Sequence, residues 1–212
     1  MGSAPISTVF LLITLSAAIL LETVMSLAGA RLSLSRMETI AVTRVLQMIV
    51  LIRLAAIQSD GLQCIGLDQQ RLKNGFITGL LWSAGFAAAV VVAAIGLAVA
   101  GIDPLALIRA PLPVPYGQRG LFLVVGGVLG PAAEELVFRG IVFGYLRRWG
   151  LPAAVVGSTA LFAFIHQGPG IPVTQIVGGL VFALAYHKSG SLVAPMMIHT
   201  LGNLAIFSLS LV

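Results

Sequence analysis

Six long apolar runs constrain the fold of this chain more than any other feature. Each is long enough, or nearly so, to cross the ~30 Å hydrocarbon core of a bilayer, which takes about 20 helical residues. Only 9% of the 212 residues are charged and 58% are hydrophobic, against about 25% charged in a soluble domain. These values exclude a soluble, disordered or nucleic-acid-binding protein. The runs cover residues 6–29, 76–102, 121–146, 152–166, 173–186 and 192–212.

A seventh, shorter apolar segment covers residues 45–57 and contains Arg53. Runs of about 10–14 residues more often lie at the interface than span. If this one does not span, nine basic residues share one face and two the other, a strong positive-inside bias. We therefore predict an all-α polytopic membrane bundle over residues 1–212, with six spans, a basic amphipathic segment and both termini outside. Seven spans remain the alternative, because an arginine inside a bundle can pair. The nine are Arg31, Arg36, Arg44, Arg53, Arg71, Lys73, Arg147, Arg148 and Lys188, and the two are Arg109 and Arg119.

Ionisable residues gather within the apolar runs of the second half of the chain. An ionisable residue at membrane depth is a functional hypothesis by default, because it costs ~2.5–3.5 kcal/mol even on the mildest scale. At ~1.5 Å per residue, three helices can bring a carboxylate, two imidazoles and an amide to one mid-membrane layer. The residues concerned are Glu134, Glu135, Arg139, His166, His199 and Asn203.

Helix geometry gives the two neighbouring glutamates different roles. Adjacent helical residues point about 100° apart, which predicts that Glu134 and Glu135 cannot both face one site. Glu135 and Arg139 are four residues apart with the acid first, the favourable order for an ion pair. We interpret them as a structural pair, which leaves Glu134 free for chemistry. Glu22, in the first run, has Arg44 or Arg53 as a possible partner and is assigned no catalytic role.

The remaining polar set is suited to hydrolysis without a nucleophilic side chain. A carboxylate beside an imidazole can deprotonate water, and His199 and Asn203, one helical turn apart, can donate hydrogen bonds to a developing oxyanion. Glu134, His166 and His199 could instead ligate zinc, with water in the fourth position. Structural readings also exist: Glu134 as a second structural carboxylate, and His199 with Asn203 as an interhelical hydrogen-bond pair.

Three motifs stand in order on successive runs, and together they resemble a known family. They read Glu134-Glu135-Leu-Val-Phe-Arg139, Phe162-Ala-Phe-Ile-His166 and His199-Thr-Leu-Gly-Asn203. This set is similar to that of the CAAX-processing and bacteriocin-processing intramembrane endopeptidases, the CPBP or Abi family. The resemblance covers about residues 121–212, a catalytic core, and leaves 1–120 as variable N-terminal helices.

The resemblance implies an all-α fold and hydrolysis of a peptide bond at a site reached from the membrane. It implies that Glu134 and His166 activate water and that His199 and Asn203 stabilise the oxyanion. The expected substrate is a peptide or lipidated protein in the bilayer, such as a prenylated CaaX tail or a peptide precursor. Members are often termed metalloproteases; we favour a metal-free, glutamate-dependent enzyme, with zinc on Glu134, His166 and His199 as the alternative.

Two other functions remain open from the sequence. One is a non-enzymatic immunity or scaffolding protein that retains the site, and the other is a small proton-coupled transporter, because buried Glu and His also form proton relays. The inverted halves expected of a transporter are not recognisable in the sequence. We expect a multi-pass protein of a prokaryotic plasma membrane.

Overall fold

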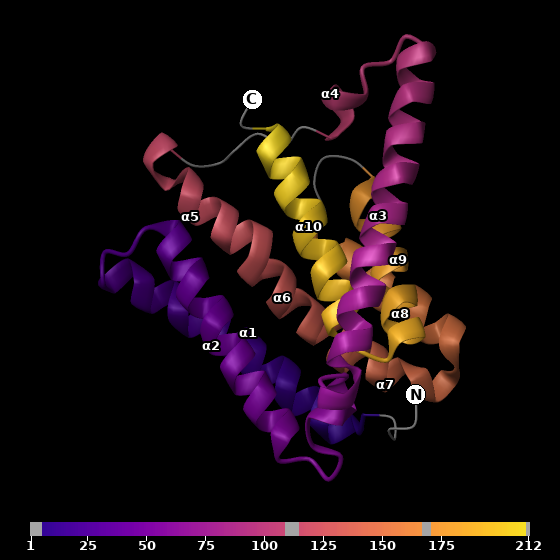
Figure 1. The fold of residues 1–212 in the computed structure, drawn as a ribbon. Helices are drawn as coiled ribbons and strands as arrows, with labels where there is room; N and C mark the ends of the chain where they lie inside the picture. The colour runs from indigo at the N-terminus through magenta and orange to yellow at the C-terminus, as the bar shows by residue number, and fades with distance from the viewer. Residues whose placement is uncertain (1–5, 109–114, 167–170, 211–212) are drawn as a thin grey trace.

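The described part of the chain folds into a bundle of long helices that run up and down (Figure 1), and these form seven helical passes. The computed structural model describes residues 6–108, 115–166 and 171–210, and these contain no strand. Four helical stretches are long and apolar enough to cross a membrane: Thr8–Arg31, Arg36–Ala56, Gly61–Val99 and Tyr116–Trp149. The all-α membrane bundle predicted from composition is therefore confirmed. The passes are α1 (Thr8–Arg31), α2 (Arg36–Ala56), α3 (Gln69–Val99), the continuous run from α5 (Arg119–Val124) to α7 (Gly144–Leu146), α8 (Leu151–Ile165), α9 (Val173–Ser189) and α10 (Val193–Leu209).

The second pass corrects the sequence prediction for residues 45–57. That apolar segment is only the second half of α2, which is 21 residues long and packs along α1. At ~1.5 Å per residue α2 is about 30 Å long, enough to cross the hydrocarbon core. The prediction that this segment is too short to span was wrong, because the first half of α2 is polar enough that it is not recognised as part of an apolar run. The structure therefore has the seven-helix arrangement, and α1 begins at the opposite end from where α10 finishes (Figure 1).

The helix ends follow local capping chemistry. Ser35 and Glu38 form a reciprocal capping box at the start of α2, and the side chain of Asp68 accepts from the backbone at the start of α3. Pro152 lies in the first turn of α8, as predicted, where its missing N–H costs nothing. Gly190 closes α9 in the left-handed conformation at φ +65°.

The pass that carries both glutamates is not a regular α-helix. It alternates between α-helix and two π-helical segments, η3 (Val125–Leu129) and η4 (Leu136–Phe143), with α6 (Gly130–Glu135) between them. In η3 the Gly130 N–H donates to the carbonyl of Val125, five residues back. With the same five-residue spacing, the backbone N–H of residue 131 would donate to the carbonyl of Gly126, but residue 131 is proline and has no N–H. The Gly126 carbonyl therefore needs a partner from outside the helix.

The two ends of the bundle differ in charge, although not in the way the sequence predicted. Because α2 is a full pass, Arg31 and Arg36 lie at the opposite end from Arg53, so the predicted nine-to-two distribution is wrong; Arg109 lies outside the described residues. The end where α2 leads into α3 still carries more positive charge, which by the positive-inside rule predicts that it faces the cytoplasm. Among the described residues, this basic end holds two acids, Asp60 and Asp68, and six bases, Arg53, Arg71, Lys73, Arg147, Arg148 and Lys188.

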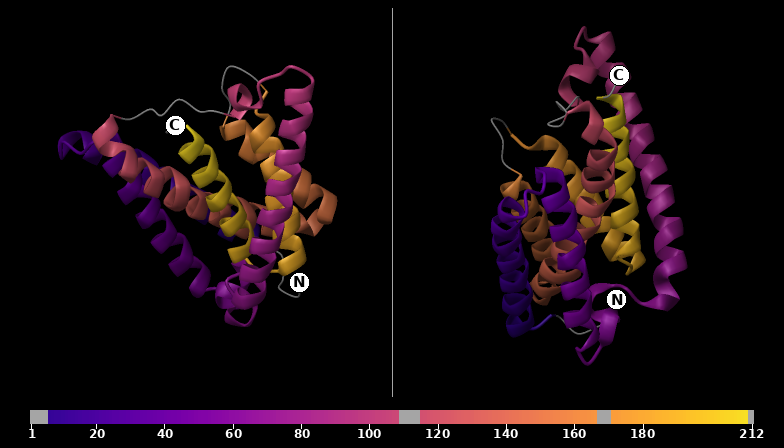
Figure 2. Two further views of the ribbon diagram at one scale, coloured as in Figure 1. Left: turned by 45° about the horizontal axis from the view of Figure 1, so that its top comes forward. Right: turned by 90° about the vertical axis from the view of Figure 1, so that its left-hand side faces the viewer.

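Helix α9 packs against both α8 and α10, and α3 packs along α10 on one side (Figure 2). The α1–α2 hairpin covers the other side and contacts the irregular pass. At the basic end, the backbone N–H of Leu192 donates to Gly66 (2.8 Å) and Arg148 bonds the carbonyl of Ile6, which tie the connections together. This arrangement brings the irregular pass, α8 and α10 to one layer, where the predicted site residues lie.

Candidate active site

Three helices bring one carboxylate and two imidazoles together. Glu134 comes from α6, His166 terminates α8 and His199 lies in the first half of α10. His166 Nε2 lies 3.8 Å from Glu134 Oε1, and His199 Nε2 lies 3.8 Å from Glu134 Oε2. These separations are too long for direct hydrogen bonds and suit a bridging water. Glu134 and His166 remain 22% and 30% exposed, so the site is open on their side.

His199 contacts both glutamates, which corrects the helix-geometry argument. Its Nδ1 lies 2.8 Å from Glu135 Oε1, while its Nε2 faces Glu134. Residues 134 and 135 do point in different directions, but an imidazole inserted between them reaches one carboxylate with each nitrogen. Glu135 is therefore part of the site's architecture as well as the partner of Arg139.

Glu135 and Arg139 form a completely buried ion pair. Their side chains are both 0% exposed, and Arg139 Nη1 donates to Glu135 Oε1 at 3.0 Å. Arg139 Nη2 donates to the backbone carbonyl of Gly179 in α9 at 3.1 Å. The same carboxylate oxygen thus accepts from both Arg139 and His199, so the pair fixes the position of the imidazole.

Aromatic rings hold these polar groups in place. Phe162 packs against His166 with ring centres 4.5 Å apart, as the spacing of one helical turn predicted. Phe182 of α9 stacks on His199 at 4.6 Å with the planes 20° apart. The guanidinium of Arg139 lies over both phenyl rings, 4.9 Å from the centre of Phe162 and 5.3 Å from that of Phe182. Cation–π contacts of this kind stabilise a buried arginine.

The hydrogen bonds of the two histidines define what each can do. His166 Nδ1 lies 2.8 Å from the carbonyl of Phe162 and must donate to it, which leaves Nε2 free to accept when the ring is neutral. Both nitrogens of His199 face carboxylate oxygens, which only accept when ionised. His199 is therefore suited to donate from Nδ1 to Glu135, while its Nε2 faces Glu134.

Asn203 has a different environment from the other predicted residues. It lies one turn beyond His199 on α10, and its Nδ2 donates to the carbonyl of Gly126 at 2.9 Å. This is the carbonyl that Pro131 leaves without a helical partner. Within the described residues, no hydrogen bond or ion pair joins Asn203 to Glu134, His166 or His199. Its role as an oxyanion donor stays a prediction.

Two observations bear on whether Glu134, His166 and His199 could hold a metal ion. Both histidines use Nδ1 for a hydrogen bond to an oxygen, as metal-ligating histidines commonly do. However, in the part of the chain that the structure describes, no three His, Cys, Asp or Glu side chains form a group that could hold a metal ion.

Sequence reasoning missed the contribution of α9. Phe182 and the Gly179 carbonyl both contact the site, yet this helix contains none of the three motifs. Its Gly178-Gly179 pair was the available signal, because small residues allow membrane helices to approach closely. A Cβ on Gly179 would lie 2.8 Å from Thr159 Cγ2 of α8, so α8 and α9 pack closely only because residue 179 is glycine.

The comparisons with known proteins concern the C-terminal part of the chain. Residues 117–205, which contain every residue of the candidate site, match the family described as type II CAAX prenyl endopeptidase Rce1-like. This segment is therefore similar to the CAAX endopeptidases, the group to which the three sequence motifs already pointed. It is also similar to the membrane-embedded CAAX protease MroQ of Staphylococcus aureus (strain USA300), with 32% identity over 90 residues. That match covers 39% of this chain and 36% of MroQ, and no solved structure matches the chain.

Proposed function

We propose that this protein is an intramembrane endopeptidase that uses Glu134 to activate water. The observation that carries the proposal is the placement of two imidazole Nε2 atoms, each 3.8 Å from an oxygen of Glu134. The match of residues 117–205 to the Rce1-like family supports the same reaction class. A buried, Phe-lined ion pair holds one of these imidazoles, which is the preorganisation that catalysis requires.

The geometry suits a water molecule held between Glu134 and His166. Such a water donates one hydrogen to a Glu134 oxygen and the other to the neutral Nε2 of His166, so its lone pairs stay free. Attack on the scissile carbonyl forms the new C–O bond as Glu134 takes a proton. Glu134 then returns that proton to the amine nitrogen as the C–N bond breaks, which completes hydrolysis.

His199 is suited to stabilise the charge that develops during attack. Glu135 fixes its ring through Nδ1, and Phe182 restricts rotation of the ring by stacking. Its Nε2 then lies on the side of Glu134, and an N–H at this position can donate to the oxyanion. Removing one such donor typically costs about 10²–10³ in kcat.

The test is proteolysis by the full-length protein in lipid vesicles with Glu134→Gln, which keeps the shape of the side chain but removes the base. Prenylated CaaX reporters and unprenylated membrane-peptide precursors form two arms, because the family resemblance suggests both substrates. We expect cleavage of at least one by wild-type protein and none by the variant. Glu38→Gln, the same exchange at an exposed helix start, is the matched control and should cleave normally.

A second readout covers substrates that neither reporter represents. New protein N-termini are compared by mass spectrometry in membranes of cells that express the wild-type protein or the Glu134→Gln variant. Products that depend on Glu134 support the proposal, and a variant that gives the same products as the wild type contradicts it. Wild-type protein that yields no products in either assay supports the non-enzymatic alternative.

We further propose that catalysis needs no metal and that the basic end of the bundle faces the cytoplasm of a prokaryotic cell. The first point is supported by the chain's own groups, because Glu134 supplies a base and His199 and Asn203 are candidate oxyanion donors. Cleavage that survives a chelator, by protein without stoichiometric zinc, would agree with it. Loss of cleavage that zinc restores would replace it with the zinc alternative on Glu134, His166 and His199.

A further inference from the structure

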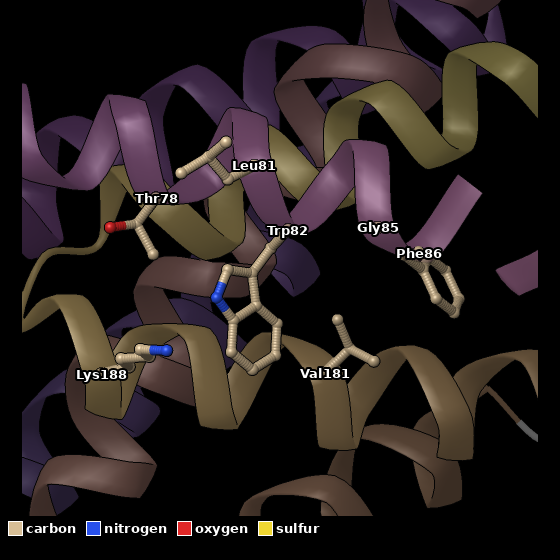
Figure 3. Close-up of a pocket in the computed structure, with 7 residues that line it drawn as sticks. All are labelled: Thr78, Leu81, Trp82, Gly85, Phe86, Val181 and Lys188. Atoms are coloured by element: carbon tan, nitrogen blue, oxygen red, sulfur yellow. The ribbon is translucent and has the colours of Figure 1, made fainter. Parts of the chain in front are cut away.

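A groove runs between α3 and α9 on the outer surface of the bundle (Figure 3). Its volume is about 540 Å³, within the usual range of small-molecule sites. It belongs to neither the catalytic set nor the three motifs. The residues that line it are Thr78, Leu81, Trp82, Gly85, Phe86, Val181 and Lys188.

The groove is polar at one end. Figure 3 shows the Lys188 ammonium and the indole nitrogen of Trp82 facing each other there, with Thr78 at the same end. The ammonium lies 6.0 Å from the centre of the Trp82 ring, at the edge of cation–π range. Within the described residues, the Trp82 indole N–H has no hydrogen-bond acceptor, so it is available to a ligand. This end offers one positive charge and two further hydrogen-bond donors.

The other end of the groove is apolar. It is formed by Phe86 and Val181, with Gly85 between the larger side chains (Figure 3). Thr78 and Phe86 are eight residues apart on α3, which corresponds to about 12 Å along the helix. One leaflet of the hydrocarbon core is about 15 Å thick. The groove therefore accommodates a large part of one hydrocarbon chain that lies parallel to the helices.

The charge around the polar end determines which amphiphile fits. Lys188 lies at the end of α9, and Arg71 and Lys73 lie near the start of α3 at the same, basic end of the bundle. Basic pockets between transmembrane helices on the cytoplasmic side are suited to anionic lipid head groups. A zwitterionic head group would gain less from the ammonium, because its own cation offsets the charge of its phosphate.

We propose that this groove binds one anionic phospholipid, with the phosphate at Lys188, Thr78 and Trp82 and an acyl chain along Val181 and Phe86. The proposal concerns a lipid site and does not depend on the peptidase reaction. It predicts a preference for phosphatidylglycerol over phosphatidylcholine of identical chains, because the two differ in net charge.

The groove is also in contact with the core that holds the candidate active site. Trp82 and Val181 pack against the buried cluster that contains Phe162 and Phe182. Phe182 is the ring that stacks on His199. A lipid in the groove thus restrains the side chains directly behind the imidazole.

The first test measures lipid retention by the full-length protein with native mass spectrometry. The probes are dioleoyl phosphatidylglycerol and dioleoyl phosphatidylcholine. We expect Lys188→Gln to weaken retention of phosphatidylglycerol about fivefold, the effect of ~1 kcal/mol per basic residue, and to leave phosphatidylcholine unchanged. Lys73→Gln is the matched control, because Lys73 lies at the same end but does not line the groove. Equal retention of both lipids by wild-type protein, or equal loss in both variants, would overturn the proposal.

The second test blocks the apolar end without disturbing the protein. A Cβ at Gly85 meets no protein atom within 4 Å, and the same is true of Gly96 on the same helix, outside the groove. Gly85→Leu should therefore fill the groove and reduce retention of phosphatidylglycerol, whereas Gly96→Leu should not. Unchanged retention in Gly85→Leu would show that the chain binds elsewhere and would contradict the proposed site. Circular dichroism and gel filtration confirm that both variants are folded.

Discussion

Two intramembrane ion pairs, chemically identical, lie in the two halves of this protein and differ in their surroundings. Glu135 and Arg139 are one turn apart on a single pass and are 0% exposed. Glu22 and Arg44 are 22 residues apart and join α1 to α2 at 2.8 Å, with 51% and 25% of their side chains exposed. The first pair is enclosed by the Gly179 carbonyl and phenyl rings. Gln47 hydrogen-bonds to both partners of the second pair.

The difference shows what burial adds to an ion pair. In the core, each partner depends on the other, because an unpaired buried charge is very unfavourable. In the hairpin, each charge has partners besides the other. Both side chains are partly exposed to solvent, Gln47 donates to Glu22, and Arg44 donates to Gln47. We therefore expect the core pair to position the active site and the hairpin pair to hold α1 against α2.

The largest expected effect is the loss of one partner of the core pair. Arg139→Met should reduce the free energy of unfolding by about 3–5 kcal/mol, because it leaves Glu135 buried without its charge partner. Chemical unfolding in micelles, followed by circular dichroism, measures this change. Glu135→Leu combined with Arg139→Met should be less destabilising than Arg139→Met alone. If the double variant is the less stable one, the pair owes its stability to something other than charge compensation.

Asn203 provides a second, smaller effect in the same half. Asn203→Leu should lower unfolding stability by up to ~1.7 kcal/mol, the upper range for a hydrogen bond between membrane helices. The loss arises because Pro131 leaves the Gly126 carbonyl without a donor in its own helix, and the variant also removes the hydrogen bond from Asn203. Measuring it in the Glu134→Gln background separates structure from catalysis. If Asn203→Leu does not change the stability of the Glu134→Gln protein, the hydrogen bond to Gly126 is not stabilising, and Asn203 would instead act as an oxyanion donor.

For the hairpin pair the expected loss is about 1 kcal/mol. Arg44→Gln keeps hydrogen-bonding groups near Glu22 and Gln47, so only the charge interaction is removed. The same unfolding measurement applies, compared directly with Arg139→Met. A loss as large as that of Arg139→Met would contradict the distinction between the two pairs.

The smallest effect should come from the capping box that begins α2. Ser35→Ala removes the side-chain acceptor for the N–H of Glu38 and should cost about 0.5–1 kcal/mol. The expected signature is faster amide hydrogen exchange confined to the first turn of α2, with unchanged exchange in α8 and α10. Faster exchange in α10 would show that the hairpin and the core unfold as one unit.

Much of the fold could be predicted from the apolar runs alone. The run at 173–186 corresponds to α9, and the run at 152–166 to α8, because long apolar segments have few alternatives in a bilayer. The sequence misjudged α2, whose first half mixes Glu38, Thr39 and Arg44 with apolar residues. That helix is accommodated because α1 supplies Glu22 and the Ala18 carbonyl as hydrogen-bond partners, a contact between helices that periodicity does not show.

The sequence by itself determined that this chain is an all-α membrane protein and which polar residues lie in its apolar runs, because hydrocarbon disfavours charge wherever it occurs. The tertiary structure decided how those residues pair. His199 bridges two glutamates whose directions along one helix seemed to separate them. Phe182 and Gly179 join the site from a helix without a motif. Such contacts depend on the distance and rotation between helices, which close packing at glycine sets and local sequence does not encode.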